Sequence, residues 1–342
     1  MDRDALLLWV KTYLPFPSQQ SDISLCALTG DAGFRHYFRV NSNPSVIAVI
    51  APPEREDNVA FVRKGLVLAA GDVHVPRVYA VNYQHGYMLQ EDLGDQLYLE
   101  ALRADTAAVL YSAAEDSLLA MQTIQPPAGL FANYDCAGLH REMALFSQWF
   151  VGELLGISLA SDEQCSLDSL FAALIDNALQ QPQVVVHRDF HARNLLVLPG
   201  DGVGVVDYQD AVVGAITYDL VSLLKDCYIR WPPAMVRQRA LHYRDRLVGA
   251  GLMTSVDDQT FLRWFDLMGL QRHIKVLGIF ARLSLRDGKH RYLDDLPLVI
   301  RYTLEAADNY VPTREFSRWL RAKLLPVAMG QPWYRAVESA GD

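Results

Sequence analysis

The stretch HRDFHARN at residues 187–194, followed by VVDYQD at 205–210, decides the fold. Apolar runs at 184–187, 195–197 and 203–206, with a Pro-Gly-Asp-Gly turn at 199–202, predict that these polar residues sit on a β-hairpin. Phosphoryl transfer from a nucleoside triphosphate needs hard oxygen ligands for a divalent metal and a carboxylate beside the acceptor hydroxyl. We therefore expect Asp189 to face the acceptor as base and Asn194 and Asp207 to bind metal, all converging on one cavity.

A purely structural turn is the alternative for this stretch. In a capped turn, Asp and Asn satisfy backbone groups, so the same residue types would occur. An Asn five residues after Asp189 and a further Asp directly after two valines favour the functional interpretation. A P-loop kinase is excluded because the sequence lacks G-x-x-x-x-G-K-[ST]. The spaced glycines at 200–204 lack the spacing and the following helix of a dinucleotide fingerprint.

The segments around the hairpin predict two lobes. The first ninety residues combine helical patterns at 3–14 and 57–70 with short strand-like runs at 24–28, 37–40, 46–50, 75–83 and 86–90. Beyond residue 100, helical spacing dominates, at 101–123, 139–156, 166–180, 234–250, 259–284, 296–309 and 313–325. We expect an α+β fold with a β-rich, nucleotide-covering N-lobe at 1–92 and a larger helical C-lobe at 93–342, which holds the catalytic hairpin and the region that binds the acceptor.

Composition sets wide limits on the partners. The chain has 342 residues, 51% hydrophobic and 21% charged, enough to bury a substantial core. Its 31 Lys+Arg against 40 Asp+Glu give a formal charge of −9, which argues against a nucleic-acid partner. We see no secretory signal and no apolar run long enough to span a membrane, so we expect a cytoplasmic protein with no membrane contact and no obligate protein partner. The four cysteines lack CxxC spacing and are expected to be reduced thiols.

The pattern HRDxxxxN followed by a second Asp is the protein-kinase signature. With His191 two residues after the Asp, it resembles the aminoglycoside phosphotransferase family of small-molecule kinases. The resemblance implies a protein-kinase-like fold, ATP as co-substrate and Mg²⁺ as cofactor. It makes Asp189 the catalytic base and Asn194 and Asp207 the magnesium ligands.

The same resemblance assigns supporting residues. In GAITYDL at 214–220, the family's Asp braces the catalytic loop through its backbone, a role that falls to Asp219. His187 is expected to pack beneath the loop. For His191, a satisfied structural histidine is favoured over direct catalysis.

Two N-terminal segments resemble the family's nucleotide-binding elements. TGDAGFR at 29–35 resembles the phosphate-covering loop, which makes nucleotide-binding candidates of Thr29, Gly30, Asp31, Ala32, Gly33 and Arg35. MLQEDLGD at 88–95 resembles the hinge that binds adenine, with candidates Gln90, Glu91, Asp92 and Leu93. The alternative for residues 29–35 is an ordinary hairpin turn, and the alternative for residues 88–95 is a solvated acidic turn.

One departure from kinases concerns the third strand. SVIAVI at 45–50 contains no lysine, although kinases commonly place there the lysine that holds the α- and β-phosphates. Either another cation replaces this lysine, with Arg35 and Arg39 as candidates, or the metal and the backbone bind the phosphates without it.

A narrower resemblance concerns the acceptor. TGDAGFRHYFRV at 29–40, APP at 51–53, EDLGD at 91–95 and QRHIKVLGIFARL at 271–283 look like one subgroup of bacterial cell-wall-recycling kinases. These phosphorylate the anomeric hydroxyl of N-acetylmuramate and N-acetylglucosamine, so the resemblance implies ATP-dependent synthesis of the sugar 1-phosphates for peptidoglycan recycling.

The residues that would contact the sugar are less defined. Arg272, Lys275 and Arg282 share one stripe of a helix and could meet the lactyl carboxylate of N-acetylmuramate, although a solvated basic face is the favoured interpretation. Asp210 is either a ligand of sugar hydroxyls or a turn residue. The alternatives in function are an aminoglycoside, choline or homoserine kinase of the same fold and, less favoured, a catalytically dead nucleotide-binding scaffold.

Overall fold

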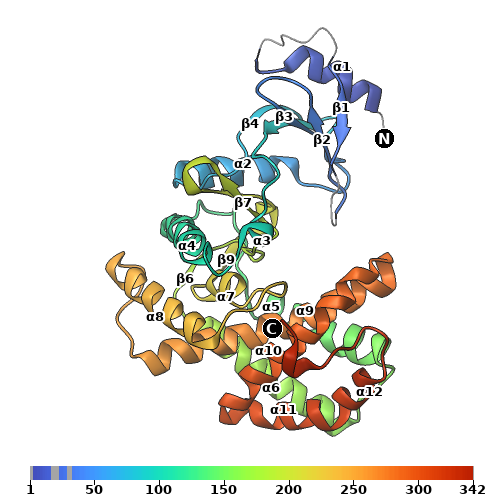
Figure 1. Ribbon diagram of the computed structural model, residues 1–342, viewed down its shortest axis with the longest axis vertical. Coiled ribbons are helices and arrows are strands. Elements are labelled where there is room, and N and C mark those ends of the chain that lie inside the picture. The colour runs from blue at the N-terminus through green and yellow to red at the C-terminus, as the bar shows by residue number, and fades with distance from the viewer. Residues whose placement is uncertain (1–2, 17–22, 29–32, 342) are drawn as a thin grey trace. The chain divides into compact units, whose positions relative to one another are not determined.

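The computed structural model describes residues 3–16, 23–28 and 33–341 (Figure 1). By internal contacts the chain divides into two compact units. Unit 1 comprises residues 1–131 and 193–211, and unit 2 comprises residues 132–192 and 212–342. The boundary falls within the HRDFHARN stretch, so Asp189 belongs to unit 2 while Asn194 and Asp207 belong to unit 1. The lobes at 1–92 and 93–342 remain a prediction.

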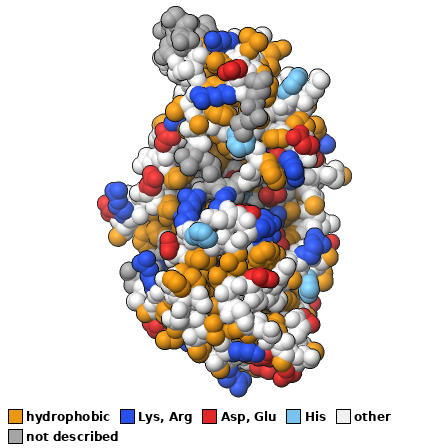
Figure 2. Space-filling view, turned by 90° about the vertical axis from the view of Figure 1, so that its right-hand side faces the viewer, with side chains coloured by type: hydrophobic (Ala, Val, Ile, Leu, Met, Phe, Trp, Pro, Cys, Tyr) orange, Lys and Arg blue, Asp and Glu red, His pale blue; other side chains and the backbone are white. Residues whose placement is uncertain are grey.

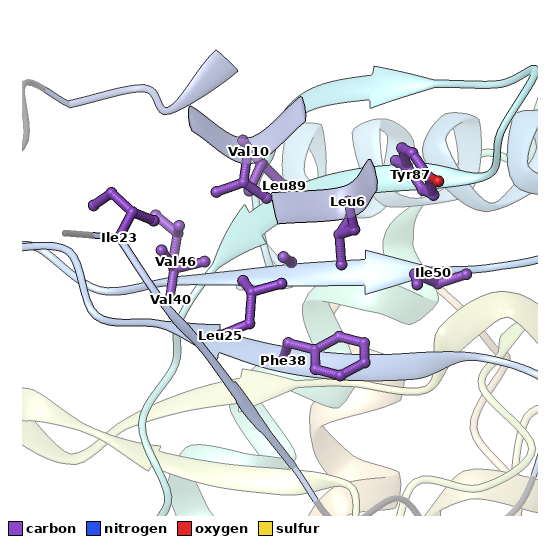
Figure 3. Packing of buried hydrophobic residues seen from close by; sticks show 11 residues of the cluster. Leu6, Val10, Ile23, Leu25, Phe38, Val40, Val46, Ile50, Tyr87 and Leu89 are labelled. Carbon is purple, nitrogen blue, oxygen red and sulfur yellow. The ribbon is translucent and has the colours of Figure 1, made fainter. Parts of the chain in front are cut away.

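Unit 1 is built on a five-stranded antiparallel sheet. Its order is β1-β2-β3-β5-β4, formed by β1 (Leu25–Ala27), β2 (His36–Val40), β3 (Val46–Ile50), β5 (Tyr87–Glu91) and β4 (Val78–Asn82). Every residue of the central strand β3 is buried, as its unbroken apolar sequence leads one to expect. Helix α1 (Arg3–Tyr13) lays Leu6 and Val10 onto this sheet, where they join Leu25, Phe38 and Leu89 (Figure 3). Burial of each such side chain stabilises the fold by roughly 1.5–3 kcal/mol.

The remainder of unit 1 presents the metal-binding candidates. Its elements are α2 (Asn58–Ala70), α3 (Tyr98–Ala101), α4 (Ala107–Thr123), β7 (Leu195–Leu198), the short turn η2 (Pro199–Asp201), β8 (Gly202–Val205) and η3 (Tyr208–Asp210). Strands β7 and β8 form the predicted hairpin, with Leu195 opposite Val205. On α2 the buried residues include Phe61, Lys64 and Leu68, whereas Leu66, which the apolar pattern places inside, is 66% exposed.

Unit 2 is mainly helical. It contains α5 (Cys136–Leu145), the π-helical η1 (Phe146–Leu154), α6 (Ser161–Leu179), β6 (Gln183–Val186), β9 (Val212–Ala215), α7 (Tyr218–Leu224), α8 (Pro233–Gly249), α9 (Asp258–Asp287), η4 (His290–Asp295), α10 (Leu296–Asn309), η5 (Val311–Thr313), α11 (Arg314–Trp319), η6 (Leu320–Leu324), α12 (Leu325–Met329) and η7 (Val337–Ser339). The 30-residue helix α9 packs against α5, η1, α6, α7, α8 and α10 (Figure 1). Strand β6 pairs with β9, a strand absent from the sequence prediction, and not with the hairpin.

The layout of a sheet with helices and a mainly helical remainder confirms the α+β class. Within the part of the chain that the structure describes, we find no helix with the length and hydropathy to cross a bilayer. Acidic and basic side chains alternate with apolar ones over the face drawn in Figure 2.

The approach of α9 to the α5–η1 junction depends on Gly278. A Cβ at this position would lie 2.4 Å from the backbone carbon of Leu145 and 2.5 Å from the backbone nitrogen of Phe146. We expect Gly278→Ala to destabilise the protein by about 1–3 kcal/mol, because the methyl group forces two backbones apart. Urea unfolding measures the difference.

Gly249→Ala is the matched control, because no atom lies within 4 Å of a Cβ at the last residue of α8. There the gain in helix propensity should leave stability unchanged or raise it by up to about 1 kcal/mol. Equal stability of the two variants would show that the helices are not in close backbone contact at Gly278.

Candidate active site

The catalytic loop is held by two buried carboxylates. Asp219, in the first turn of α7, accepts the backbone N–H of His187 at 2.6 Å and that of Arg188 at 3.0 Å. Asp226 accepts the backbone N–H of Ala192 at 2.9 Å. Both ends of the segment 187–192 are therefore fixed through backbone N–H groups, so these hydrogen bonds do not use its side chains. Asp219 thus contacts the loop through two backbone N–H groups.

The loop has a strained backbone and a buried histidine. Arg188 has φ 78°, a left-handed conformation that side chains rarely adopt and that Asp219 helps to hold. His187 is fully buried, packs edge-on against Phe190 and accepts the backbone N–H of Asp189 at Nδ1, 3.3 Å away. His187 thus packs against a residue of its own loop.

Asp189 itself is partly exposed and surrounded by positive charge. Burial pushes the pKa of Asp189 upward, but Lys275, His191 and the arginines 272 and 188 outweigh it, so the pKa lies well below its ordinary value. The carboxylate is therefore ionised throughout the physiological range. It can accept a hydrogen bond from an acceptor hydroxyl at any such pH.

Lys275 belongs to a buried ion network that the sequence did not indicate. Its Nζ lies 3.4 Å from Glu142 and donates to the Tyr218 hydroxyl at 2.9 Å. Glu142 also pairs with Arg188 and accepts from the Tyr134 hydroxyl. Burial opposes ionisation of Glu142, but the two cations hold its pKa below the usual value. The network links α5 and α9 to the catalytic loop.

The favoured sequence interpretation of Arg272 and Lys275 as a solvated basic face is wrong. Arg272 is 2% exposed and Lys275 is 3% exposed, because α9 is covered by helices on several sides. Arg282, two turns further on, is half-buried. The Nη1 atom of Arg272 donates to the thiol of Cys227 at 3.2 Å.

His191 differs in one respect from a fully satisfied histidine. It is 9% exposed and its ring lies edge-on to Tyr228, with centroids 5.5 Å apart. Among the described residues, Nδ1 finds no hydrogen-bond partner. Burial lowers the pKa of His191, so the ring is neutral near pH 7.

In unit 1 the hairpin brings the two metal-ligand candidates to neighbouring strand ends. Asn194 directly precedes β7 and Asp207 follows β8, and the backbone N–H of Val206 donates to the Asn194 carbonyl at 3.0 Å. Asp207 is exposed, has φ 66°, and accepts from the Gln209 side chain at 2.6 Å. Asp210, at the end of η3, is also exposed. A half-buried amide and an exposed carboxylate at one edge offer the hard oxygens that Mg²⁺ prefers.

No group of three or more His, Cys, Asp or Glu with metal-binding geometry occurs in the described ranges. Magnesium usually takes one or two protein ligands and completes its shell with phosphates and water. Asn194 and Asp207 fit that requirement, since they supply two oxygen donors.

Lys64 is a residue near the site that sequence reasoning missed. Its Nζ donates to the backbone carbonyl of Gln209 at 2.6 Å and to that of Ala211 at 2.9 Å, and it lies over the Phe131 ring. The sequence did carry a signal for Lys64: it follows Phe61 by three residues, which places both on the buried face of α2. It fixes the segment that follows Asp207.

Of the two candidates for the missing strand-three lysine, Arg39 is already engaged. Its guanidinium contacts Asp92 at 2.6 Å and Asp95 at 2.7 Å, and Ser45 also donates to Asp92. Burial opposes ionisation of Asp92, but these hydrogen bonds hold its pKa low. Arg39 therefore clamps the segment after β5.

Arg35, the other candidate, is also engaged. It pairs with Glu56 at 2.9 Å and lies over the Phe61 ring. Burial raises the pKa of Tyr37 to about 12, and the charges of Arg35, Asp207 and Glu56 all act on this phenol. Arg35, Asp207 and Glu56 therefore all lie within electrostatic range of Tyr37.

The remaining nucleotide-binding candidates are only partly described. Thr29, Gly30, Asp31 and Ala32 lie outside the described residues, and Gly33 has φ 111°, open to glycine alone among common residues. In the hinge candidate, Gln90 is buried in β5 and the Glu91 carboxylate lies 3.1 Å from His74. Leu93 packs closely against Gly204, since a Cβ added to Gly204 would lie 2.8 Å from the Leu93 side chain.

The carboxylate of Asp219 makes stability depend on pH in a specific direction. Burial raises the pKa of Asp219 to about 6, above its unfolded value, so this group favours folding at low pH and loses that contribution as pH rises through 6. We expect the stability deficit of Asp219→Asn relative to wild type to shrink by about 1 kcal/mol between pH 5 and 7.5. Urea unfolding of both proteins at the two pH values measures it. A deficit that grows with pH would contradict the raised pKa.

Comparison with known proteins places the chain in a family. Residues 24–253 match the phosphotransferase enzyme family. A protein of Pseudomonas putida named N-acetylmuramate/N-acetylglucosamine kinase is 42% identical over 283 residues, covering 82% of this chain and 83% of the relative. A Neisseria meningitidis protein of the same name is 34% identical over 308 residues, covering 88% and 90%.

Solved structures show the fold. An ADP-bound aminoglycoside phosphotransferase, APH(2'')-Ib, superposes with a TM-score of 0.56 at 14% identity, covering 90% of this chain and 99% of that one. A Plasmodium vivax ethanolamine kinase gives 0.62 at 11% identity, covering 89% and 95%. The fold is protein-kinase-like, as predicted. Since the family match spans more than half of the sequence and both relatives exceed 30% identity, the chain belongs to the phosphotransferase enzyme family.

Proposed function

We propose that this enzyme transfers the γ-phosphoryl group of ATP to the anomeric hydroxyl of N-acetylmuramate and N-acetylglucosamine, making sugar 1-phosphates for peptidoglycan recycling. The observation that carries the proposal is an ionised Asp189 on a loop whose backbone is fixed by Asp219. The names of the relatives at 42% and 34% identity support the choice of sugar. Because ATP is a cytoplasmic metabolite, we place the reaction in the cytoplasm.

The low pKa of Asp189 suits this acceptor. An anomeric hydroxyl is more acidic than an ordinary alcohol, so a weakly basic carboxylate suffices to take its proton. Phosphoryl transfer passes through a loose transition state in which the attacking oxygen needs orientation more than full deprotonation. Asp189 supplies that orientation as a fixed hydrogen-bond acceptor.

Asn194 and Asp207 would hold Mg²⁺. When bound, this ion neutralises charge on the β- and γ-phosphates. For the nucleotide we propose Gly33 and Arg35 at the phosphates and the backbone of residues 90–93 at the adenine.

Removal of the proposed base should abolish most turnover. We expect Asp189→Asn to lower kcat by roughly 10²-fold or more with either sugar, because the amide cannot take the proton. ATP binding and the unfolding midpoint should change little. A coupled ADP assay with N-acetylmuramate, N-acetylglucosamine and kanamycin, together with phosphorus NMR of the product, measures turnover, acceptor and phosphorylated position.

Asp201→Asn is the matched control, since this exposed Asp lies in the turn between β7 and β8. It should keep near wild-type kcat. Near-normal turnover of Asp189→Asn would remove Asp189 as the base, and a kanamycin preference would replace the proposed acceptor.

Lys64 offers a separate test of the Asp207 segment. Lys64→Met leaves the carbonyls of Gln209 and Ala211 without their donor and loosens the chain beside the proposed magnesium ligand. We expect the Mg²⁺ concentration for half-maximal activity to rise by about 10-fold, with the KM for sugar unchanged. Titration of activity with Mg²⁺ at saturating sugar measures the shift.

The neighbouring Arg63 is exposed, so Arg63→Met controls for loss of a positive charge on α2. A Lys64→Met enzyme with unaltered Mg²⁺ dependence would show that Lys64 only supports folding.

A further inference from the structure

Arg272 is a buried cation that lacks an ion-paired carboxylate among the described residues, although the charges of Asp189 and Asp226 act on it from a longer distance. Its guanidinium is 2% exposed, and within the described ranges no carboxylate lies within ion-pair distance of it. Its Nε atom has no hydrogen-bond partner there either. Lys275, less than one turn further along α9, shows the usual arrangement, with Glu142 and the Tyr218 hydroxyl beside it.

The hydrogen bond that Arg272 makes to Cys227 does not neutralise it. Nη1 donates to the Cys227 thiol at 3.2 Å, and burial raises the pKa of that thiol to about 11, so the sulfur is uncharged. A neutral thiol is a weak acceptor. Burial of an unpaired ion is unfavourable by several kcal/mol, and proteins seldom keep one unless something else pairs with it.

Arg272 also lies on the side of the catalytic loop that carries the base. Cys227 directly follows Asp226, whose carboxylate holds the Ala192 backbone N–H at 2.9 Å. The charge of Arg272 acts on both Asp189 and Asp226. An anion paired with Arg272 would therefore belong to a molecule bound at Asp189.

We propose that Arg272 binds the lactyl carboxylate of N-acetylmuramate, an assignment that rests on the proposed function. The two proposed sugars differ by this ether-linked lactyl group alone, so only one of them brings a negative charge. A guanidinium pairs with a carboxylate through two parallel hydrogen bonds, and Nε is one of the donors that can take part. The pairing would satisfy the free Nε and would give the guanidinium a carboxylate at hydrogen-bond distance.

The test compares the two sugars on one variant. Arg272→Met keeps the length of the side chain and removes its charge. We expect the ratio of kcat/KM for N-acetylmuramate to that for N-acetylglucosamine to fall by roughly 10–100-fold, the usual effect of losing a charged hydrogen-bonded pair. Arg272→Lys keeps the positive charge but cannot form two parallel hydrogen bonds, so it should lower the ratio less. The thermal midpoint of Arg272→Met should equal or exceed that of wild type, because no ion pair among the described residues is lost.

A second arm measures binding without turnover. Calorimetric titration of wild type with N-acetylmuramate and its methyl ester should show weaker binding of the neutral ester, and Arg272→Met should bind the two alike. Arg263→Met, which removes an exposed guanidinium from the same helix, is the matched control and should keep the wild-type ratio.

The outcomes separate the two proposals. If wild type phosphorylated both sugars and Arg272→Met kept their ratio within about threefold, the carboxylate site would be overturned and the proposed function would stand. An equal loss of roughly 10²-fold or more with both sugars would also overturn it, since Arg272 would then serve the base or the transferred group. If wild type phosphorylated neither sugar, the proposed function would fall and the carboxylate site with it.

Discussion

The catalytic loop depends on one buried carboxylate that accepts two consecutive backbone N–H groups. Asp219 is fully buried, and its two oxygens hold the amides of His187 and Arg188. Charged acceptors make stronger hydrogen bonds than neutral ones, which offsets part of the desolvation that raises the pKa of Asp219 and helps to hold the strained φ of Arg188. The loop therefore has its shape before any ligand binds. Catalysis of phosphoryl transfer depends on such preorganisation.

The ion network around Lys275 acts on the charge state of Asp189, the proposed base, more than on stability. A buried ion pair often contributes little net stability, because desolvation cancels most of the attraction. Here the cations Lys275 and Arg188 share Glu142 and still outweigh burial at Asp189, whose pKa stays low. The arrangement keeps the proposed base ionised but also makes it a weak base. A weak base suits an acidic hydroxyl better than an ordinary one.

Local patterns in the sequence predicted much of this structure, and non-local packing accounts for the misses. The β7–β8 hairpin and helices α8 and α9 lie within a few residues of the predicted ranges, because turn chemistry and helical period are local signals. Strand β9 was missed because Val212–Ala215 is short and pairs with β6 across the whole hairpin. The burial of Arg272 and Lys275 was missed because their polarity indicates a surface, whereas several other helices cover α9.

The helix α2 shows how the fold compensates for the lysine missing from β3. In protein kinases a strand lysine and a helix glutamate form an ion pair that couples the helix to the phosphates. Here the helix carries the cation, and Lys64 donates to two main-chain carbonyls directly after Asp207. Carbonyl acceptors cannot lose their charge or swing away on a side chain, so this coupling needs no partner residue on the strand. That frees β3 to remain wholly apolar, as all five of its residues are buried. Arg35, paired with Glu56, is the cation that we propose for the phosphates.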